Sequence, residues 1–182
     1  METSEGTMTM AFYYDVAPNT STNFLALAEE GYFDGQVFHR IIKNFVVQGG
    51  DPLGRDPARG GTGGPGFMID AEFNDRQHQK GVLSMARQGD PLEAQGMMPR
   101  SDAANSASSQ FFICLDYSRT KALDGKYTVF GKVVEGMDVV DKLAGMPTGA
   151  GDRPTNPPEI KKVTVRVVTP EKNPYAKLFA VE

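Results

Sequence analysis

The stretch VFHRIIKNFVVQGGD, residues Val37–Asp51, contains two short apolar runs that are rich in β-branched and aromatic side chains. Such runs, bounded by polar turn residues, are typical of β-strands. We expect strands over Val37–Ile42 and Phe45–Gln48, joined by a turn at Lys43-Asn44.

This strand pair contains one arginine, Arg40, among apolar side chains. Residues two apart in a strand share a face, so Arg40 is expected beside Ile42, and Val46 beside Gln48. The turn would bring these two pairs together. A guanidinium is costly to remove from water unless it has a partner. The stretch therefore predicts either a structural ion pair or a donor held ready for a ligand.

The composition is that of an ordinary globular protein with 182 residues, 40% hydrophobic and 23% charged. We expect one domain, or one domain with an appendage. A net charge of −4 argues against nucleic-acid binding and provides no basic surface for a membrane. The single cysteine, Cys114, excludes an internal disulfide, and METSEGTMTM at the N-terminus does not have the pattern of a signal peptide. These features predict a cytoplasmic protein.

The remaining elements are predicted from periodicity and from turn residues. Further strands are expected at Thr7–Phe12, Val82–Ala86, Gln110–Leu115, Tyr127–Val134 and around Val163–Val167. Helices are expected from Pro18 to Gly31, with Phe24, Leu27 and Ala28 buried, and from Gly136 to Gly145. The Asp-Gly pair within Leu123–Lys126 predicts a hairpin turn. Many short strands with two helices indicate an antiparallel sheet or barrel with helices packed over its ends.

Two segments, one rich in glycine and one polar, have the composition of loops. The Gly-rich segment Gly54–Gly66 resembles a phosphate-binding loop only superficially, because it has neither a Gly-Lys-Ser/Thr ending nor an amphipathic helix behind it. We interpret it as a surface loop. The polar segment Arg87–Ser109 is a long loop, and loops of that length are often functional or mobile.

The few reactive side chains favour no familiar catalytic group. With histidines only at His39 and His78, a Ser-His-Asp arrangement stays open, but no nucleophile-elbow motif is present. Metal binding would require more ligands at suitable spacing. Cys114, inside an apolar strand, is interpreted as a buried inert thiol, His39 as a hydrogen-bonded structural residue, and His78 as solvated or locally bonded. The remaining set of an arginine, a glutamine and apolar residues suits a reaction without proton removal or a covalent intermediate.

Four motifs, in order and at matching spacing, resemble the cyclophilin family of peptidyl-prolyl isomerases. They are FHRIIKNFVVQGGD (38–51), SMA (84–86), SQFFICL (109–115) and LDGKYTVFGKVVEGMDVVDKL (123–143). The resemblance covers about residues 4–168 and is greatest to bacterial single-domain members. It implies a mainly β fold, an eight-stranded antiparallel closed barrel capped by two α-helices. We expect this domain to occupy residues 1–169, followed by a C-terminal extension at 170–182.

The resemblance also implies a site on the outer face of the barrel. The catalytic candidates are Arg40, Phe45 and Gln48, with Arg40 matching the catalytic arginine and Gln48 the glutamine that binds the substrate backbone. The substrate-binding candidates are Val46, Ala86, Arg87, Gln110, Phe112, Leu123 and Tyr127. In the family, the proline pocket is lined at the positions of Phe45, Val46, Phe112, Leu123 and Tyr127. Ala86, Arg87 and Gln110 match its rim, where the backbone at Arg87 binds the peptide.

The implied activity is cis–trans isomerisation of X-Pro bonds in unfolded or flexible chains, assisting folding, by a monomer without cofactor or metal. The expected partners are proline-containing peptides and unfolded proteins, with no nucleic acid or membrane. The alternatives are a proline-peptide binding module or holdase, and a small-molecule binding barrel. Three departures from the family matter. Ala122 replaces a tryptophan, which predicts weak cyclosporin binding; Tyr127 replaces a histidine; and Gln88–Asn105 is a longer loop that we expect to alter sequence selectivity.

Overall fold

The computed structural model describes residues 1–176, and residues 177–182 lie outside that description. Residues 1–176 form a mainly β fold with a few helices. The strands are β1 (Glu2–Thr3), β2 (Gly6–Thr7), β3 (Thr9–Phe12), β4 (Arg40–Ile42), β5 (Val46–Gly49), β6 (Val82–Met85), β7 (Phe111–Cys114), β8 (Val129–Glu135) and β9 (Ile160–Lys162). The α-helices are α1 (Pro18–Glu29), α2 (Ser101–Ala104), α3 (Tyr117–Thr120) and α4 (Met137–Ala144). Single 3₁₀ turns are η1 (Pro91–Gln95), η2 (Lys121–Leu123), η3 (Ala150–Asp152) and η4 (Pro170–Lys172).

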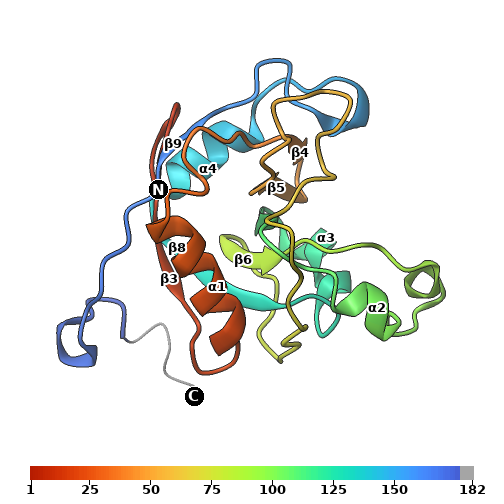
Figure 1. The fold of residues 1–182 in the computed structure, drawn as a ribbon, viewed down its shortest axis with the longest axis horizontal. Helices are drawn as coiled ribbons and strands as arrows, with labels where there is room; N and C mark the ends of the chain where they lie inside the picture. The colour runs from red at the N-terminus through yellow and green to blue at the C-terminus, as the bar shows by residue number, and fades with distance from the viewer. Residues whose placement is uncertain (177–182) are drawn as a thin grey trace.

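The strands pair in antiparallel fashion in two sheets. The larger sheet has the order β3-β8-β6-β7-β5-β4, and the smaller one has the order β2-β1-β9. The two sheets meet where residues 35–38 run beside residues 158–160. There the amide of Phe38 donates to the carbonyl of Pro158 at 3.0 Å, and Val37 and Glu159 form an isolated bridge. Figure 1 shows β9 close to the N-terminus, as this pairing requires.

Side-chain alternation divides the larger sheet into two faces. The register across β4, β5, β7 and β6 aligns one row of side chains, Ile41, Val47, Ile113 and Leu83. All four are at most 1% exposed and belong to the main hydrophobic core. The next row on the opposite face is Arg40, Gln48, Phe112 and Ser84. The main core therefore occupies one face, and the other face is left to a smaller apolar cluster and to the polar groups beside it.

The two longer helices cover the edges of this core, as Figure 1 shows. Helix α1 begins at Pro18, whose missing amide proton costs nothing in the first helical turn. Its buried stripe contains Phe24, Leu27 and Ala28, as the sequence predicts. The Phe24 ring stacks on Phe33 with centroids 4.7 Å apart. Helix α1 packs against β8, and α4 packs beside β4 and β5.

Several predicted elements differ from the structure at their boundaries or in their pairing. The first strand is interrupted at Met8, which separates β2 from β3. The predicted tight turn at Leu123–Lys126 is present, with the amide of Lys126 donating to the carbonyl of Leu123 at 3.0 Å. It does not form a hairpin, because the chain passes from β7 through α3 and η2, and β8 then pairs with β3 and β6. The predicted strand around Val163–Val167 is wrong, since pairing ends with β9 at Lys162. Val167 is 92% exposed, so alternation of valines alone did not indicate burial there.

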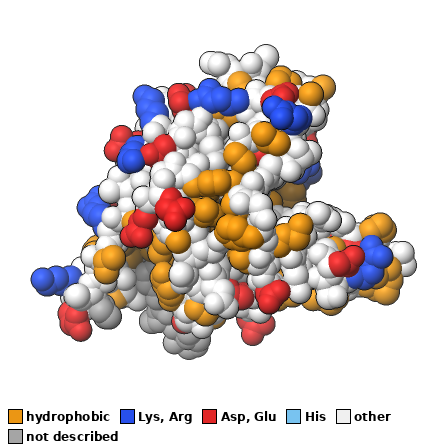
Figure 2. All heavy atoms as spheres, in the orientation of Figure 1, with side chains coloured by type: hydrophobic (Ala, Val, Ile, Leu, Met, Phe, Trp, Pro, Cys, Tyr) orange, Lys and Arg blue, Asp and Glu red, His pale blue; other side chains and the backbone are white. Residues whose placement is uncertain are grey.

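The long loop after β6 has regular structure of its own. It contains η1 and α2, and exposed Met97 and Met98 lie between them. Figure 2 shows hydrophobic and charged side chains gathered on a projection at the right of the molecule, where Figure 1 places this loop. Among residues 1–176, no helix has the length and apolar character needed to cross a membrane. The predicted C-terminal extension is described only as far as residue 176.

Candidate active site

The β4–β5 hairpin places Arg40 opposite Gln48 and Ile42 opposite Val46, so the turn brings the two same-face pairs together, as the sequence predicts. The turn between the strands contains Asn44 in the left-handed region, with φ 59°. Nη1 of Arg40 donates to Oε1 of Gln48 at 3.5 Å, a long contact, and the arginine side chain is 44% exposed. The guanidinium is therefore held at the surface rather than buried in the core. It keeps donors that a ligand can reach.

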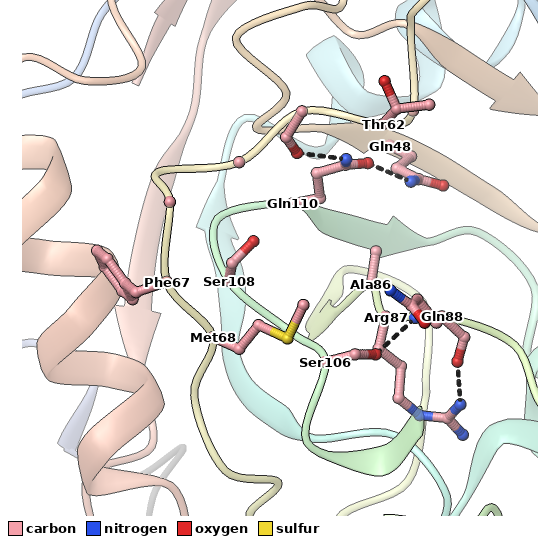
Figure 3. A pocket seen from close by; sticks show the side chains of 14 residues that line it. Gln48, Thr62, Phe67, Met68, Ala86, Arg87, Gln88, Ser106, Ser108 and Gln110 are labelled. Carbon is pink, nitrogen blue, oxygen red and sulfur yellow. Dashed lines mark hydrogen bonds between the residues drawn. The ribbon is translucent and has the colours of Figure 1, made fainter. Parts of the chain in front are cut away.

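Gln48 is also fixed from its other side. Its Nε2 donates to Oε1 of Gln110 at 3.0 Å, and Nε2 of Gln110 donates to the carbonyl of Gly63 at 2.9 Å (Figure 3). Each amide thus donates to the next acceptor in a chain. This chain sets the orientation of the Gln48 amide and links β5, β7 and the Gly-rich loop.

An apolar cluster lies on the same sheet face as Arg40 and Gln48. Its buried members include Val46 and Phe112, and its partly buried members include Phe45, Ala86, Leu123 and Tyr127. The Tyr127 ring packs edge-on against Phe112, with centroids 6.0 Å apart and an interplanar angle of 70°. Burial raises the pKa of Tyr127, so its hydroxyl keeps its proton at neutral pH. The structure therefore brings the predicted pocket residues together from β5, β7 and the segment before β8.

A groove with a volume of about 680 Å³ extends from this cluster, and Figure 3 shows its lining. Gln48, Ala86 and Gln110 line this groove, and Gln48 connects it to Arg40. The opposite wall is formed by residues of the Gly-rich loop and by Phe67 and Met68. The groove is open and its volume leaves room for an extended peptide. Its polar and apolar lining residues suit the mixed polarity of a peptide chain.

The side chain of Arg87 lies away from the open groove. Although Arg87 is among the residues that line the groove, its side chain is only 2% exposed. Figure 3 shows the guanidinium directed away from Gln48, and Nη1 donates to the carbonyl of Gln88 at 2.7 Å. Arg87 thus contributes to the rim through its main chain, and its side chain has another set of partners.

Behind the pocket, His78 is fully buried. Of the two predicted alternatives, solvated or locally bonded, the first is therefore wrong, whereas the ring is hydrogen-bonded. Its ring lies nearly parallel to Phe112, with centroids 6.2 Å apart. Nδ1 lies 2.8 Å from Oδ1 of Asp124, and Nε2 lies 3.0 Å from Oγ of Ser84. Ser84 is also completely buried and donates to the carbonyl of Thr128. This Ser-His-Asp arrangement supports Phe112 from below and presents no nucleophile to solvent.

His39 is buried as expected for a structural residue, but neither of its ring nitrogens has a hydrogen-bond partner among the described residues. The prediction that it is hydrogen-bonded is therefore wrong. Burial lowers the pKa of both His39 and His78, which keeps both rings neutral. Cys114 is fully buried and its pKa is raised by burial, in agreement with an inert thiol. Among residues 1–176, no cluster of three or more potential metal ligands is present.

Sequence reasoning missed one neighbour of Arg40. Oδ2 of Asp152 lies 3.5 Å from Nε of Arg40, with both side chains nearly half exposed. Asp152 ends η3, in the Pro/Gly-rich connection that the sequence presents only as a linker. Its backbone is left-handed, with φ 58°, next to Gly151 with φ 67°. The run of glycines around this position was the available signal for a tight approach to the site.

Comparison with known proteins agrees with this fold. The family described as cyclophilin type peptidyl-prolyl cis-trans isomerase/CLD matches residues 1–165. A "Peptidyl-prolyl cis-trans isomerase-like 1" of Neurospora crassa is 42% identical over 173 residues, covering 94% of both chains. The "Peptidyl-prolyl cis-trans isomerase ppi1" of Schizosaccharomyces pombe is 42% identical over 164 residues, covering 89% of this chain and 94% of the relative.

A solved structure is similar in three dimensions as well. A cyclophilin type peptidyl-prolyl cis-trans isomerase of Cryptosporidium parvum, crystallised in the presence of the dipeptide Ala-Pro, has a TM-score of 0.77 and 29% identity. The alignment covers 92% of this chain and 98% of that one. The chain belongs to the family of cyclophilin-type peptidyl-prolyl cis–trans isomerases, and its reaction is the rotation of X-Pro bonds. These relatives are eukaryotic, so the expected likeness to bacterial members gains no support from them.

Proposed function

We propose that Arg40 is the catalytic donor of this isomerase. An X-Pro bond resists rotation because of amide resonance, with a barrier of about 18–20 kcal/mol. Twisting the bond localises a lone pair on the proline nitrogen, and a guanidinium is a donor that does not lose its proton. A hydrogen bond from Arg40 to this nitrogen stabilises the twisted form more than either planar form, as catalysis requires. The observation that carries the proposal is the position of exposed Arg40 on the same sheet face as the apolar cluster.

The other site residues hold the substrate while the bond rotates. Phe45, Val46 and Phe112 form the walls of the proline pocket, and Leu123 and Tyr127 form its edge. Gln48 binds the substrate backbone, and its fixed amide supports that role. The residues before proline lie along Ala86, the main chain of Arg87 and Gln110, which line the adjoining groove.

The proposed substrates are unfolded or flexible proline-containing chains, whose folding the enzyme assists. The open groove supports this, because a peptide segment has to enter in extended form. We further propose that the protein acts as a cytoplasmic monomer, without cofactor, and binds neither nucleic acid nor membranes. With Ala122 at the position of the family's tryptophan, cyclosporin binds weakly.

The proposal for the fold is one closed eight-stranded barrel capped by α1 and α4. Two observations support closure. Residues 35–38, which lead into β4, pair with the segment at β9, and Met1 and Met8 exchange backbone hydrogen bonds that connect β1 with the start of β3. Counting β2 and β3 as one interrupted strand gives the eight strands of such a barrel.

The test is a cis-to-trans rate assay on a proline tetrapeptide, with binding of the same peptide measured separately. We expect Arg40→Ala to lower kcat about 100-fold, which is a typical cost of removing one transition-state donor, while peptide binding is retained. Arg55→Ala is the matched control, because Arg55 is an exposed arginine whose carboxylate partner, Glu159, lies outside the site. Equal rates for wild type and Arg40→Ala would overturn the catalytic role of Arg40. Peptide binding by the wild type without turnover would instead support a binding module or holdase.

A further inference from the structure

Arg87 is the most completely buried guanidinium of the site region, and every part of its head group has a partner. Nη1 and Nη2 donate to the two carboxylate oxygens of Glu93 at 3.0 and 2.9 Å. Nη2 and Nε also donate to the carbonyl of Lys126, at 2.9 and 3.3 Å. A bidentate arginine–carboxylate pair has a fixed relative geometry. The guanidinium plane is therefore locked in place between the long loop and the residue that precedes Tyr127.

This locked plane lies on the Tyr127 ring. The central carbon of the Arg87 guanidinium is 4.0 Å from the centroid of that ring. A cation over an aromatic face at this distance is attracted by the ring. The ring also meets Phe112 edge-on. Tyr127 is thus held between an apolar pocket wall and a buried cation. Burial is the largest cause of the raised pKa of its hydroxyl, the charge of Arg87 opposes it, and the charge of Glu93 and a hydrogen bond with Glu93 add to it.

Glu93 is itself fixed by the structure of the loop. It is the third residue of η1, and its carboxylate accepts from the amide of Asp90, forming a capping box. Asp90 has a fully buried side chain that accepts from the amide and from Nε of Arg100, at 2.9 and 2.8 Å. Hydrogen bonds to its carboxylate, first from an amide of the capped turn and then from Arg100, lower the pKa of Asp90 to about 2. This anchor is therefore charged at all physiological pH values. The loop therefore presents Glu93 to Arg87 in a defined position.

We propose that Arg87 and Glu93 are positioning residues that hold the Tyr127 ring as the edge of the proline pocket. The proposal rests on the function proposed above, because it assigns to Tyr127 a contact with the proline ring. It extends that function to the long loop, which acts on the pocket through one buried ion pair and not only through contacts with the peptide.

The proposal predicts a specific kinetic signature for Glu93→Gln. Glutamine retains the size and the capping ability of glutamate but lacks the charge that orients Arg87. A looser pocket edge weakens binding of the substrate in its ground state and in its transition state by the same amount. This raises KM and leaves kcat unchanged. We expect KM for a proline tetrapeptide to rise about threefold to tenfold, with kcat within about twofold of wild type. Arg87→Lys, which keeps the charge but removes the planar fork, is expected to give the same split.

The matched control is a second arginine–tyrosine–carboxylate arrangement, whose tyrosine, Tyr13, belongs to the same apolar cluster but is not one of the residues assigned to the proline pocket. Arg76 lies 4.1 Å from the centroid of the Tyr13 ring and pairs with Asp15 at 2.6 Å. Asp15→Asn removes a carboxylate from this second arginine–tyrosine pair, and KM is expected to stay at the wild-type value. Far-UV circular dichroism and thermal unfolding verify that each variant is folded. If Glu93→Gln is not folded, Arg87→Lys serves as the test variant.

A double-mutant cycle with Tyr127→Ala separates positioning from general structural support. If Glu93 acts through Tyr127, adding Glu93→Gln to Tyr127→Ala leaves KM unchanged. An unchanged KM in folded Glu93→Gln and Arg87→Lys would overturn the proposal, and so would an undiminished effect of Glu93→Gln in the Tyr127→Ala background. Either result leaves the proposed role of Arg40 intact, since that role fails only if Arg40→Ala keeps the wild-type rate.

Discussion

At the scale of single residues, burial decides what the two histidines contribute. His78 is fully buried with partners on both ring nitrogens, whereas His39 is buried without a hydrogen-bond partner among the described residues. Burial is the largest cause of the lowered pKa of each ring, and the nearby carboxylates Asp124 and Asp51 only partly oppose it. Both histidines therefore stay neutral in the folded protein at pH values where an exposed histidine takes up a proton.

This predicts that the folded state loses stability as the pH falls below 6.5, the ordinary pKa of an exposed histidine. The unfolded chain takes up protons in this range and the folded chain does not, so the free energy of unfolding decreases. The limiting slope is about 1.4 kcal/mol per pH unit for each histidine. Urea unfolding at pH 7.5, 6.5 and 5.5 measures it, with His39→Gln expected to give a shallower slope. A free energy of unfolding that is flat across these pH values would contradict the prediction.

At the scale of elements, the segment 88–105 is an ordered insertion with closely spaced ends. The amide of Arg100 donates to Oδ2 of Asp90 at 2.9 Å, so the chain between them leaves and returns at nearly the same place. Gln88 is fixed in the same way, because its amide donates to Oγ of Ser106 at 2.8 Å. The tip between these anchors carries the exposed side chains of Met97 and Met98, and the two ends of the segment, at Gln88 and Ser106, line the groove.

We therefore expect that replacing Pro91–Pro99 by a single glycine gives a folded enzyme with altered sequence selectivity. The relative kcat/KM values over a panel of X-Pro peptides, varied at the residues before proline, should change by about threefold or more. Because the deletion also removes Glu93, Glu93→Gln is the reference for any effect that is uniform across peptides. Unchanged ratios across the panel would show that the loop tip plays no part in substrate choice.

At the scale of the whole molecule, we expect the extension after residue 169 to add little to the stability of the domain. The described part of this tail contains η4 and a hydrogen bond between Tyr175 and Glu135, which lowers the pKa of Glu135. Ending the chain after Thr169 is expected to shift the midpoint of thermal unfolding by less than about 2 °C and to leave kcat/KM unchanged. A thermal melt and the tetrapeptide assay check this. A fall of more than about 5 °C would mean that the extension docks on the domain.

Local patterns in the sequence predicted a large part of the fold and of the site. The hairpin around Arg40 and Gln48 followed from alternation and a turn, both of which involve only near neighbours along the chain. The helix stripe at Phe24, Leu27 and Ala28 followed in the same way. The pocket residues were assigned only through a family resemblance, because their proximity depends on pairing between distant strands.

What the sequence did not predict depends on long-range contacts. The burial of His78 depends on Asp124 and Ser84, and the latter comes from a neighbouring strand. The role of the Arg87 side chain depends on Glu93, inside a loop whose short turns have no hydrophobic periodicity. The end of pairing at Lys162 is set by the length of β1, which no pattern in the last strand records.

Phe111 and Phe112 are neighbours in β7, and different demands act on their side chains. Phe111 is completely buried in the main core, whereas Phe112 faces the pocket cluster. A change at an inward position of this strand affects whether the chain folds, and a change at an outward position affects what the chain recognises. Because the two sets alternate and share no side chain, we expect substitutions in the pocket set to change recognition while the core side chains of β7 stay in place. The pleat of β7 thereby places the side chains that build the core and those that face the pocket on opposite sides of one strand.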